Sequence, residues 1–274
     1  MTTIKHVLAI AGSDPSGGAG IQADIKAISA NGAYAMAAIT ALTAQNTRGV
    51  RGVRLVAPEF VVAQIDAVFE DIRVDAVKIG MLGSPEITLA VAEALARHRA
   101  PRLVLDPVMI AKGGDRLLSE TAIRTLIERL LPLATILTPN LPEAAALLDE
   151  PELIDPQAMP ALAERLLALG PSAVLLKGGH LSGSTSPDYL ATTKGGLWLE
   201  AERLPTKNTH GTGCTLSSAL AAQLAIGAEP MAAARAAKAY VAGAIAHADS
   251  LEVGQGQGPT HHFHALWNAR HGLG

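Results

Sequence analysis

The chain has 274 residues, of which 49% are hydrophobic and 17% charged, and its formal net charge is -3. This length suits one large α/β domain, spanning residues 1–274, and is short for two full domains. No basic surplus exists to neutralise a phosphate backbone, so a nucleic-acid partner is not expected, and one cysteine excludes an internal disulfide framework and favours a reducing, cytoplasmic location.

Short apolar runs alternate with amphipathic helical patterns along the chain. The runs predicted as strands are 6–11, 36–43, 75–80, 102–107, 135–140 and 173–178. Between them, apolar residues recur at spacings of three and four in 21–32, 58–72, 85–98, 119–131 and 156–170, which predicts helices. The alternation indicates βαβ crossovers and a mostly parallel sheet, and the continuous apolar strands are typical of a sheet covered on both faces.

The region 188–205 breaks this alternation. Two runs flank Lys194-Gly195-Gly196, which predicts a β-hairpin at the sheet edge. Two more helices are predicted at 213–226 and 229–249. The alanine-rich stretches carry Gln, Lys, Arg or His within helical reach, so no membrane span is expected.

Polar groups follow the carboxyl ends of most of the predicted strands. In parallel α/β sheets, ligands bind beyond these ends. One polar loop alone means little, because loops are polar in any protein, but their convergence predicts a site. The groups are Gly12-Ser13-Asp14, Lys78-Ile79-Gly80-Met81, Asp106-Pro107-Val108, Thr138-Pro139-Asn140 and Lys177-Gly178-Gly179.

Two glycine-rich segments compete for a phosphate-binding role. GSDPSGGAG (12–20) fails the P-loop pattern, since Gly18 stands where that pattern requires lysine. A tight turn and a loop that lets a flat ligand approach the backbone both remain open there. HGTGCT (210–215) opens a helix, whose first N–H groups attract anions. A plain helix start is the alternative, and Leu216 in place of a third glycine disfavours a dinucleotide site.

Side chains for catalysis and for binding of phosphate or metal are also present. Cys214 lies at the start of that helix, which predicts a thiol more acidic than usual, although a lone cysteine is more often inert core. Lysines 177, 207 and 238 can surround a polyphosphate, and Asp106, Asn140 and Glu143 can hold a hydrated Mg²⁺. Lys207 and Glu143, taken singly, are ordinary surface charges. HHFH (261–264) lacks the i, i+4 spacing of a helical zinc site and is interpreted as packing and surface.

Six motifs, in order and with intact spacing, give the chain a family resemblance. AGSDPSGGAGIQADIKAISANGAYAMAAITALTAQNTRGV, KIGMLGS, VLDPVMIAKGG, LTPNLPEAAALL, VLLKGGH and TKNTHGTGCTLSSALAA closely resemble the hydroxymethylpyrimidine/phosphomethylpyrimidine kinases of thiamine biosynthesis. The resemblance covers nearly the whole chain. It implies a ribokinase-like three-layer α/β/α sandwich with a mostly parallel central sheet, use of ATP and Mg²⁺, and a homodimer. It also implies two phosphorylations of 4-amino-5-hydroxymethyl-2-methylpyrimidine, first to the monophosphate and then to the pyrophosphate.

The resemblance also implies roles for individual residues. Gln45 corresponds to the glutamine that contacts the pyrimidine, and Cys214 takes the place of the catalytic aspartate of related sugar kinases. The N–H groups of Gly211, Thr212 and Gly213 would stabilise the phosphoryl group. The other implied contacts are Gly12, Asp24, Met81, Val108 and His210 for the pyrimidine, Lys177, Asn140, Lys207, Thr209 and Lys238 for ATP, and Asp106 and Glu143 for Mg²⁺.

The chemistry explains two of these choices. An aminopyrimidine edge presents an N–H donor beside a ring-nitrogen acceptor, and the Gln45 amide offers the complementary pair. An alcohol nucleophile needs a proton acceptor, whereas a phosphate oxygen does not, so Cys214 is expected to serve the first transfer more than the second. Two alternatives remain: a pyridoxal or pyridoxine kinase, and a non-catalytic pyrimidine-binding relative.

Overall fold

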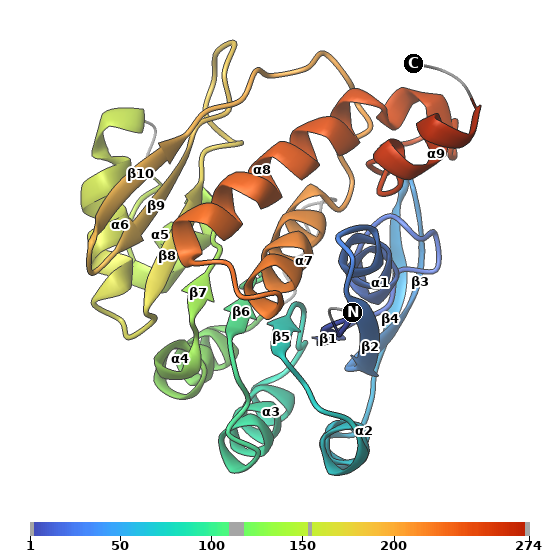
Figure 1. Cartoon of the computed structure of the whole chain (residues 1–274). Helices are drawn as coiled ribbons and strands as arrows, with labels where there is room; N and C mark the ends of the chain where they lie inside the picture. Colours follow the sequence, from blue (N-terminus) through green and yellow to red (C-terminus); the bar gives the residue numbers. More distant parts are fainter. Residues whose placement is uncertain (1–2, 110–117, 153–154, 272–274) are drawn as a thin grey trace.

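The computed structural model describes residues 3–109, 118–152 and 155–271 (Figure 1). The strands are β1 (His6–Ala11), β2 (Tyr34–Ile39), β3 (Ala41–Asn46), β4 (Gly49–Leu55), β5 (Ala76–Ile79), β6 (Leu103–Leu105), β7 (Ile136–Leu137), β8 (Ala173–Lys177), β9 (Asp188–Thr192) and β10 (Gly195–Leu199). The α-helices are α1 (Gly20–Ala30), α2 (Pro58–Asp71), α3 (Pro85–Arg97), α4 (Glu120–Arg129), α5 (Leu141–Leu148), α6 (Met159–Leu167), α7 (Thr212–Ala225), α8 (Pro230–Ala246) and α9 (His264–His271).

One eight-stranded sheet organises the molecule, in the order β10-β9-β8-β7-β6-β5-β1-β2. From β2 across to β8 every neighbouring pair is parallel. Strand β9 pairs antiparallel with both β8 and β10. The mostly parallel sheet with a hairpin at its edge, as expected from the sequence, is confirmed.

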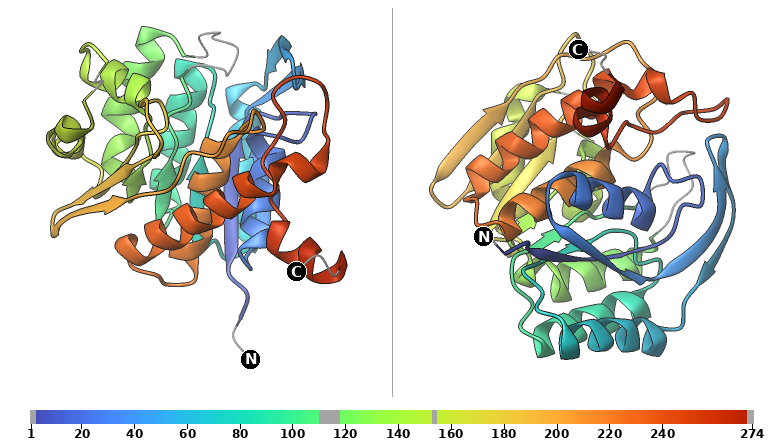
Figure 2. Two further views of the ribbon diagram at one scale, coloured as in Figure 1. Left: turned by 90° about the horizontal axis from the view of Figure 1, so that it is seen from above. Right: turned by 45° about the vertical axis from the view of Figure 1, so that its right-hand side comes forward.

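Helices cover both faces of this sheet, because successive strand residues point to opposite sides. In β1, Leu8 and Ile10 face a core that also contains apolar residues of α2 to α6. Val7, Ala9 and Ala11 face a second core, built with α1, α7 and α8. The three layers place the N-terminus of α7 over the carboxyl ends of the central strands (Figures 1 and 2).

The apolar run 36–43, predicted as one strand, is two strands in two different sheets. The chain leaves the main sheet at Thr40, whose N–H donates to the Ala11 carbonyl (3.1 Å) and whose hydroxyl donates to the Met81 carbonyl (2.7 Å). Beyond it, β3 pairs with β4 and forms a two-stranded ribbon apart from the main sheet (Figure 2). This ribbon carries Gln45.

One further difference concerns the helices. Helix α5 was not predicted; it begins with a capping box in which Asn140 and Glu143 each accept a backbone N–H from the other. Helices α7 and α8 begin and end within a few residues of the predicted bounds. Across residues 3–109, 118–152 and 155–271, none of the helices has the length and apolar character that crossing a bilayer requires.

Candidate active site

A cavity of about 1000 Å³ opens beyond the carboxyl ends of β1, β5, β6 and β8. It also reaches the ribbon and the N-terminus of α7. The structure therefore brings together residues that are far apart in sequence, such as Gly12 and Lys238. Among its lining residues are Gly12, Gln45, Met81, Asp106, Val108, Asn140, Glu143, Lys177, Thr209, His210, Gly211, Thr212, Gly213, Cys214 and Lys238, all predicted from the sequence.

At one end of the cavity, Gln45 faces His210 with 3.3 Å between their Nε2 atoms. The same His210 nitrogen lies 2.8 Å from Asp14 Oδ2. A carboxylate can only accept, so His210 donates to Asp14 and the Gln45 NH₂ group keeps its hydrogens for another acceptor. Asp14 was expected near the site as part of Gly12-Ser13-Asp14, but the sequence assigned it no role of its own.

Asp14 organises that loop through further hydrogen bonds. Its oxygens accept from the N–H (2.9 Å) and hydroxyl (2.6 Å) of Ser16 and from the Ala19 N–H (2.9 Å). Burial disfavours the charge on Asp14, but the hydrogen bonds from His210 and Ser16 outweigh it and hold the pKa of Asp14 below its usual value. An ionised Asp14 thus joins the 12–20 loop to the 210–213 turn.

Apolar groups close the same end of the cavity. A Cβ at Gly12 would lie 2.5 Å from Met81 Cε, so the thioether packs directly on the loop backbone. Val108 also lines the cavity. Residues 110–114, the end of the motif VLDPVMIAKGG, lie outside the described residues.

Gly211 forms the turn that leads into α7. Its φ of 76° is in the left-handed region, and a Cβ there would lie 1.8 Å from the Gly18 carbonyl oxygen. Only glycine suits this position. The two glycine-rich segments, far apart in sequence, therefore pack backbone against backbone.

The amides at the start of α7 differ from the prediction in one respect. The Thr212 N–H donates to the Thr209 carbonyl (3.3 Å), which also accepts the Thr212 hydroxyl (2.8 Å). Gly213 and Cys214 occupy the next two positions of the first turn, where N–H groups have no intrahelical acceptor. The pair of amides best placed for an anion is thus that of Gly213 and Cys214.

Three charged side chains meet beside these amides. Lys177 Nζ donates to Asp106 Oδ1 (2.9 Å) and lies 3.8 Å from Glu143 Oε2. Burial opposes the charge on Asp106, but Lys177 and Lys78 outweigh it and lower its pKa. Burial raises the pKa of Glu143 to about 7, with Asp106 adding to the effect and Lys177 opposing it. Glu143 therefore has too little positive charge nearby to offset its burial.

The donor set at this point suits a hydrated Mg²⁺. Asp106 and Glu143 offer hard carboxylate oxygens, and the raised pKa of Glu143 indicates room for additional positive charge. Within the described ranges there is no cluster of three or more His, Cys, Asp or Glu residues arranged for a metal. Mg²⁺ commonly needs only one or two carboxylates together with water and substrate phosphates.

The thiol of Cys214 is not acidified, contrary to the prediction. Burial raises its pKa to about 11; Lys78 opposes this rise, whereas Asp24 and Asp106 add to it. The sulfur also accepts a hydrogen bond from the Gly20 N–H. The favourable effect of a helix N-terminus is small compared with the cost of removing a thiolate from water. At neutral pH Cys214 is a thiol.

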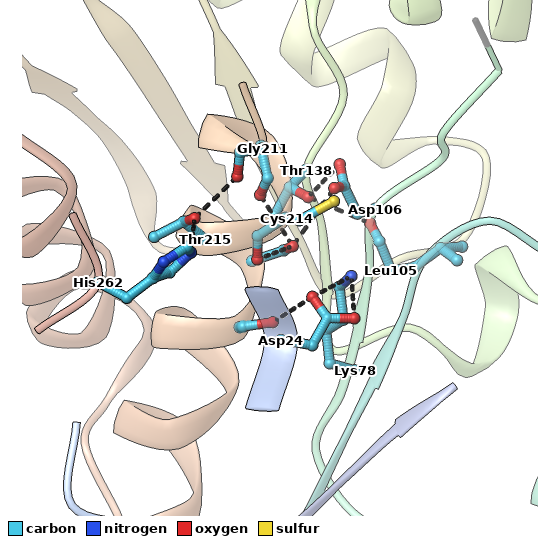
Figure 3. Close-up of polar contacts among 12 residues, drawn as sticks. Asp24, Lys78, Leu105, Asp106, Thr138, Gly211, Cys214, Thr215 and His262 are labelled. Atoms are coloured by element: carbon cyan, nitrogen blue, oxygen red, sulfur yellow. Dashed lines mark hydrogen bonds and ion pairs between the residues drawn. The ribbon is translucent and has the colours of Figure 1, made fainter. Parts of the chain in front are cut away.

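The prediction that Asp24 lines the pyrimidine pocket is wrong. Its side chain is fully buried, and both carboxylate oxygens accept from Lys78 Nζ at 2.8 and 2.9 Å (Figure 3). The Ser218 hydroxyl donates to Oδ1 as well (2.8 Å). With both oxygens accepting, the carboxylate is ionised, and despite burial Asp24 raises the pKa of Lys78. This ion pair lies beneath Cys214; a lysine inside the apolar run DAVKIG was its signal in the sequence.

Two lysines that were predicted to contact ATP, Lys207 and Lys238, are placed differently from that prediction. Lys207 is not among the residues that line the cavity. Lys238 reaches the cavity wall, but its Nζ donates to Asp188 Oδ2 (2.7 Å) and to the Ser186 carbonyl (2.8 Å). Lys238 therefore acts mainly on the chain that follows β8.

Arg203 holds the segment between β8 and β9, which borders the cavity near Gly179. Its guanidinium donates to four carbonyl oxygens at 2.6 to 3.3 Å. The acceptors are those of Gly179, Leu181, Gly183 and Thr185.

Comparison with known proteins assigns the chain to a family. The family model described as phosphomethylpyrimidine kinase matches residues 14–261. A hydroxymethylpyrimidine/phosphomethylpyrimidine kinase of Salmonella typhimurium is 56% identical over 262 residues, which are 96% of this chain and 98% of the relative. The Escherichia coli protein of the same name is 55% identical over the same shares.

Solved structures agree on the fold. A Bacillus subtilis pyridoxal kinase in complex with ADP is 37% identical, with a TM-score of 0.88 over 95% of this chain and 98% of that one. A phosphomethylpyrimidine kinase of Clostridium difficile is 46% identical, with a TM-score of 0.76 over 86% and 97%. The ribokinase-like α/β/α fold is thus confirmed, and the chain is a kinase that belongs to the phosphomethylpyrimidine kinase family.

Proposed function

We propose that the protein transfers the γ-phosphoryl group of ATP to the hydroxymethyl group of 4-amino-5-hydroxymethyl-2-methylpyrimidine, and then phosphorylates the monophosphate to the pyrophosphate. The observation that carries this proposal is one cavity with two chemically different ends. The Gln45 amide lies at one end, and the amides of Gly213 and Cys214 lie beside Lys177 at the other. Kinases of thiamine biosynthesis among the relatives support the choice of substrate.

The recognition end suits an aminopyrimidine. Because His210 is committed to Asp14, the Gln45 amide can offer its N–H to a ring nitrogen and its oxygen to the exocyclic amino group. Met81 and Val108 provide apolar contact with the ring. A site that binds through such directed hydrogen bonds discriminates strongly against analogues that lack them.

The transfer end stabilises charge on the moving phosphoryl group. The oxygen nucleophile forms a bond to the γ-phosphorus, the bond from that phosphorus to the ADP oxygen breaks, and ADP leaves. Positioned donors lower this barrier most, and here these are the N–H groups of Gly213 and Cys214 with the Lys177 ammonium. Asp106 and Glu143 would hold Mg²⁺, which neutralises charge on the phosphates when bound.

The proton of the alcohol has to leave in the first transfer. Cys214 can accept it only as a thiolate, and a pKa of about 11 leaves a fraction of about 10⁻⁴ in that form at pH 7. Lys78 favours the thiolate. A loose transition state places little demand on the nucleophile, so a scarce base can suffice. In the second transfer the nucleophile is already anionic.

The protein is further proposed to work as a single kinase domain and as a homodimer, as the resemblance stated for the sequence implies. A cytoplasmic location is proposed because its one cysteine is a free thiol and suits a reducing compartment.

A coupled ADP-release assay tests the proposal. Purified protein with ATP and Mg²⁺ is given the pyrimidine alcohol, its monophosphate or pyridoxal in separate reactions. Turnover of both pyrimidines is expected. Turnover of pyridoxal alone would instead favour vitamin B6 phosphorylation, which solved relatives of similar fold suggest. Binding of the pyrimidine without ADP release would indicate a non-catalytic relative.

A further inference from the structure

The chain segment 255–262, between α8 and α9, lies against the active-site turn (Figure 2). The His210 N–H donates to the Gly258 carbonyl (3.0 Å), and the Gly258 N–H donates to Asn208 Oδ1 (3.0 Å). The Gln257 N–H donates to the Thr47 carbonyl at the tip of the ribbon (2.9 Å). The segment therefore contacts both the β3–β4 ribbon and residues 208–211, which lead into α7.

This close approach is built into the sequence of the segment. A Cβ at Gly256 would lie 2.1 Å from the Thr47 carbonyl oxygen. Only glycine lets the two backbones come so near. The motif that follows, HHFH, was interpreted from sequence as packing and surface, yet its second histidine faces the start of α7.

His262 is buried and contacts the first turn of α7. Its Nε2 lies 3.1 Å from the Thr215 hydroxyl oxygen (Figure 3). That hydroxyl lies 2.8 Å from the Gly211 carbonyl, which can only accept, so the single hydroxyl hydrogen points there. Towards His262 the hydroxyl can only accept. This arrangement assigns the Nε2–H tautomer to His262, which then donates to Thr215; the Thr260 hydroxyl, 3.3 Å from the same Thr215 oxygen, is its other neighbour.

The surroundings keep the His262 ring uncharged. Burial, together with the positive charge of Lys26 and the neighbouring His261 and His264, lowers its pKa to about 3. The ring is neutral throughout the physiological range. The backbone is fixed too, since the Tyr240 hydroxyl donates to the His262 carbonyl (2.7 Å).

The contact between His262 and Thr215 acts on the Gly211–Thr212 peptide, which precedes the amides of Gly213 and Cys214. The Gly211 carbonyl accepts both the N–H and the hydroxyl of Thr215, each at 2.8 Å. Because a peptide is planar, holding this carbonyl fixes the Gly211–Thr212 peptide and the direction in which α7 begins. Gly211 is conformationally free and offers no capping side chain, so the restraint has to come from elsewhere.

We propose that His262 is a positioning residue for phosphoryl transfer. It holds the Thr215 hydroxyl on the Gly211 carbonyl and thereby aims the N–H groups of Gly213 and Cys214 at the phosphoryl group. The inference rests on the proposed function. The 255–262 segment, which follows α8, would thus help to position the groups that act in phosphoryl transfer.

Paired variants test the contact by steady-state kinetics. His262→Leu and Thr215→Val remove the donor and the hydroxyl, and both are expected to lower kcat of both transfers by about 10²-fold. The KM of the pyrimidine alcohol should change by no more than about twofold, because the amides act in the transition state. Thr215→Ser and His262→Gln keep a hydroxyl and an N–H donor and should recover most of kcat. His264→Gln, two residues further along at the start of α9 and away from the turn, is the matched control.

A measurement without turnover completes the test. In ¹⁵N-histidine-labelled protein, the His262 signal, identified by its loss in His262→Gln, should show the Nε2–H tautomer at neutral pH. The Nδ1–H tautomer would overturn the proposal. So would wild-type kcat in folded His262→Leu and Thr215→Val, and Thr215→Val alone decides if the leucine variant does not fold. An inactive wild-type enzyme would instead refute the proposed function.

Discussion

Replacing Lys78 by methionine probes the ion pair beneath the active site. Lys78 and Asp24 are both fully buried, and the ammonium donates to both carboxylate oxygens. Methionine is close to lysine in shape but has no charge. In Lys78→Met the Asp24 carboxylate keeps only the Ser218 hydroxyl as a donor among the contacts described above. The variant therefore leaves a buried charge without its counter-charge.

The expected loss is large for a single substitution. Removing one partner of a buried ion pair typically costs about 3–5 kcal/mol in the free energy of unfolding. For a chain of this size, each kcal/mol lowers the melting temperature by roughly 2–4 °C. A drop of roughly 6–20 °C is thus expected in a calorimetric melt. Asp24→Asn, which strands the ammonium instead, should fall in the same range.

The double variant Lys78→Met/Asp24→Asn distinguishes the ion pair from simple packing. With both charges gone, no buried charge lacks a partner, so the double variant should be more stable than either single variant. Its KM for the pyrimidine alcohol should stay near that of the wild type, because Asp24 does not line the cavity and the ammonium of Lys78, a residue that does line it, is bound to Asp24. The reasoning fails if Lys78→Met melts within about 2 °C of the wild type, or if the double variant loses the sum of the two single losses.

Three further predictions concern turnover. Cys214→Ala should slow the first transfer by about 10²-fold or more and the second by far less. Because the thiol pKa is about 11, the first transfer of the wild type should also speed up about tenfold per pH unit from pH 7 to 9. Equal losses in the two transfers, or a flat pH profile, would exclude a base role. Gly213→Val should slow both transfers by about 10²-fold, measured in separate assays, because a Cβ there already lies 3.3 Å from Lys177 Nζ and 3.6 Å from Asp106 Oδ2. Gln45→Glu should raise the KM of the pyrimidine alcohol by about tenfold or more while the KM of ATP is unchanged, since a carboxylate loses the N–H donor; an unchanged pyrimidine KM would argue against ring recognition by Gln45.

Much of the fold could be predicted from periodicity, because β1, β5, β6, β7 and β8 are short apolar runs separated by helical patterns. The division of 36–43 could not. An apolar run shows that its residues are buried, but not which strand each residue pairs with. The side chain of Thr40 and the carbonyls of Ala11 and Met81 decide where the chain leaves the sheet, and those partners are distant in sequence.

The site residues likewise divide into those that the sequence could place and those that it could not. Residues at the ends of central strands, such as Asp106 and Lys177, could be placed together because the strand topology brings those ends to one edge of the sheet. Asp24 could not, since only the packed structure shows that Lys78 reaches across from β5 to meet it. For Cys214, the helix terminus is visible in the sequence, but the desolvation that outweighs it is not.

The β3–β4 ribbon carries Gln45 yet shares no backbone pairing with the eight-stranded sheet, whose strand ends hold the phosphoryl-transfer groups. Gln45, proposed to recognise the ring, and the groups proposed to transfer the phosphoryl group consequently lie on separate parts of the same chain. Substitutions along the ribbon are therefore expected to alter ring recognition while leaving the eight-stranded scaffold of the transfer groups intact.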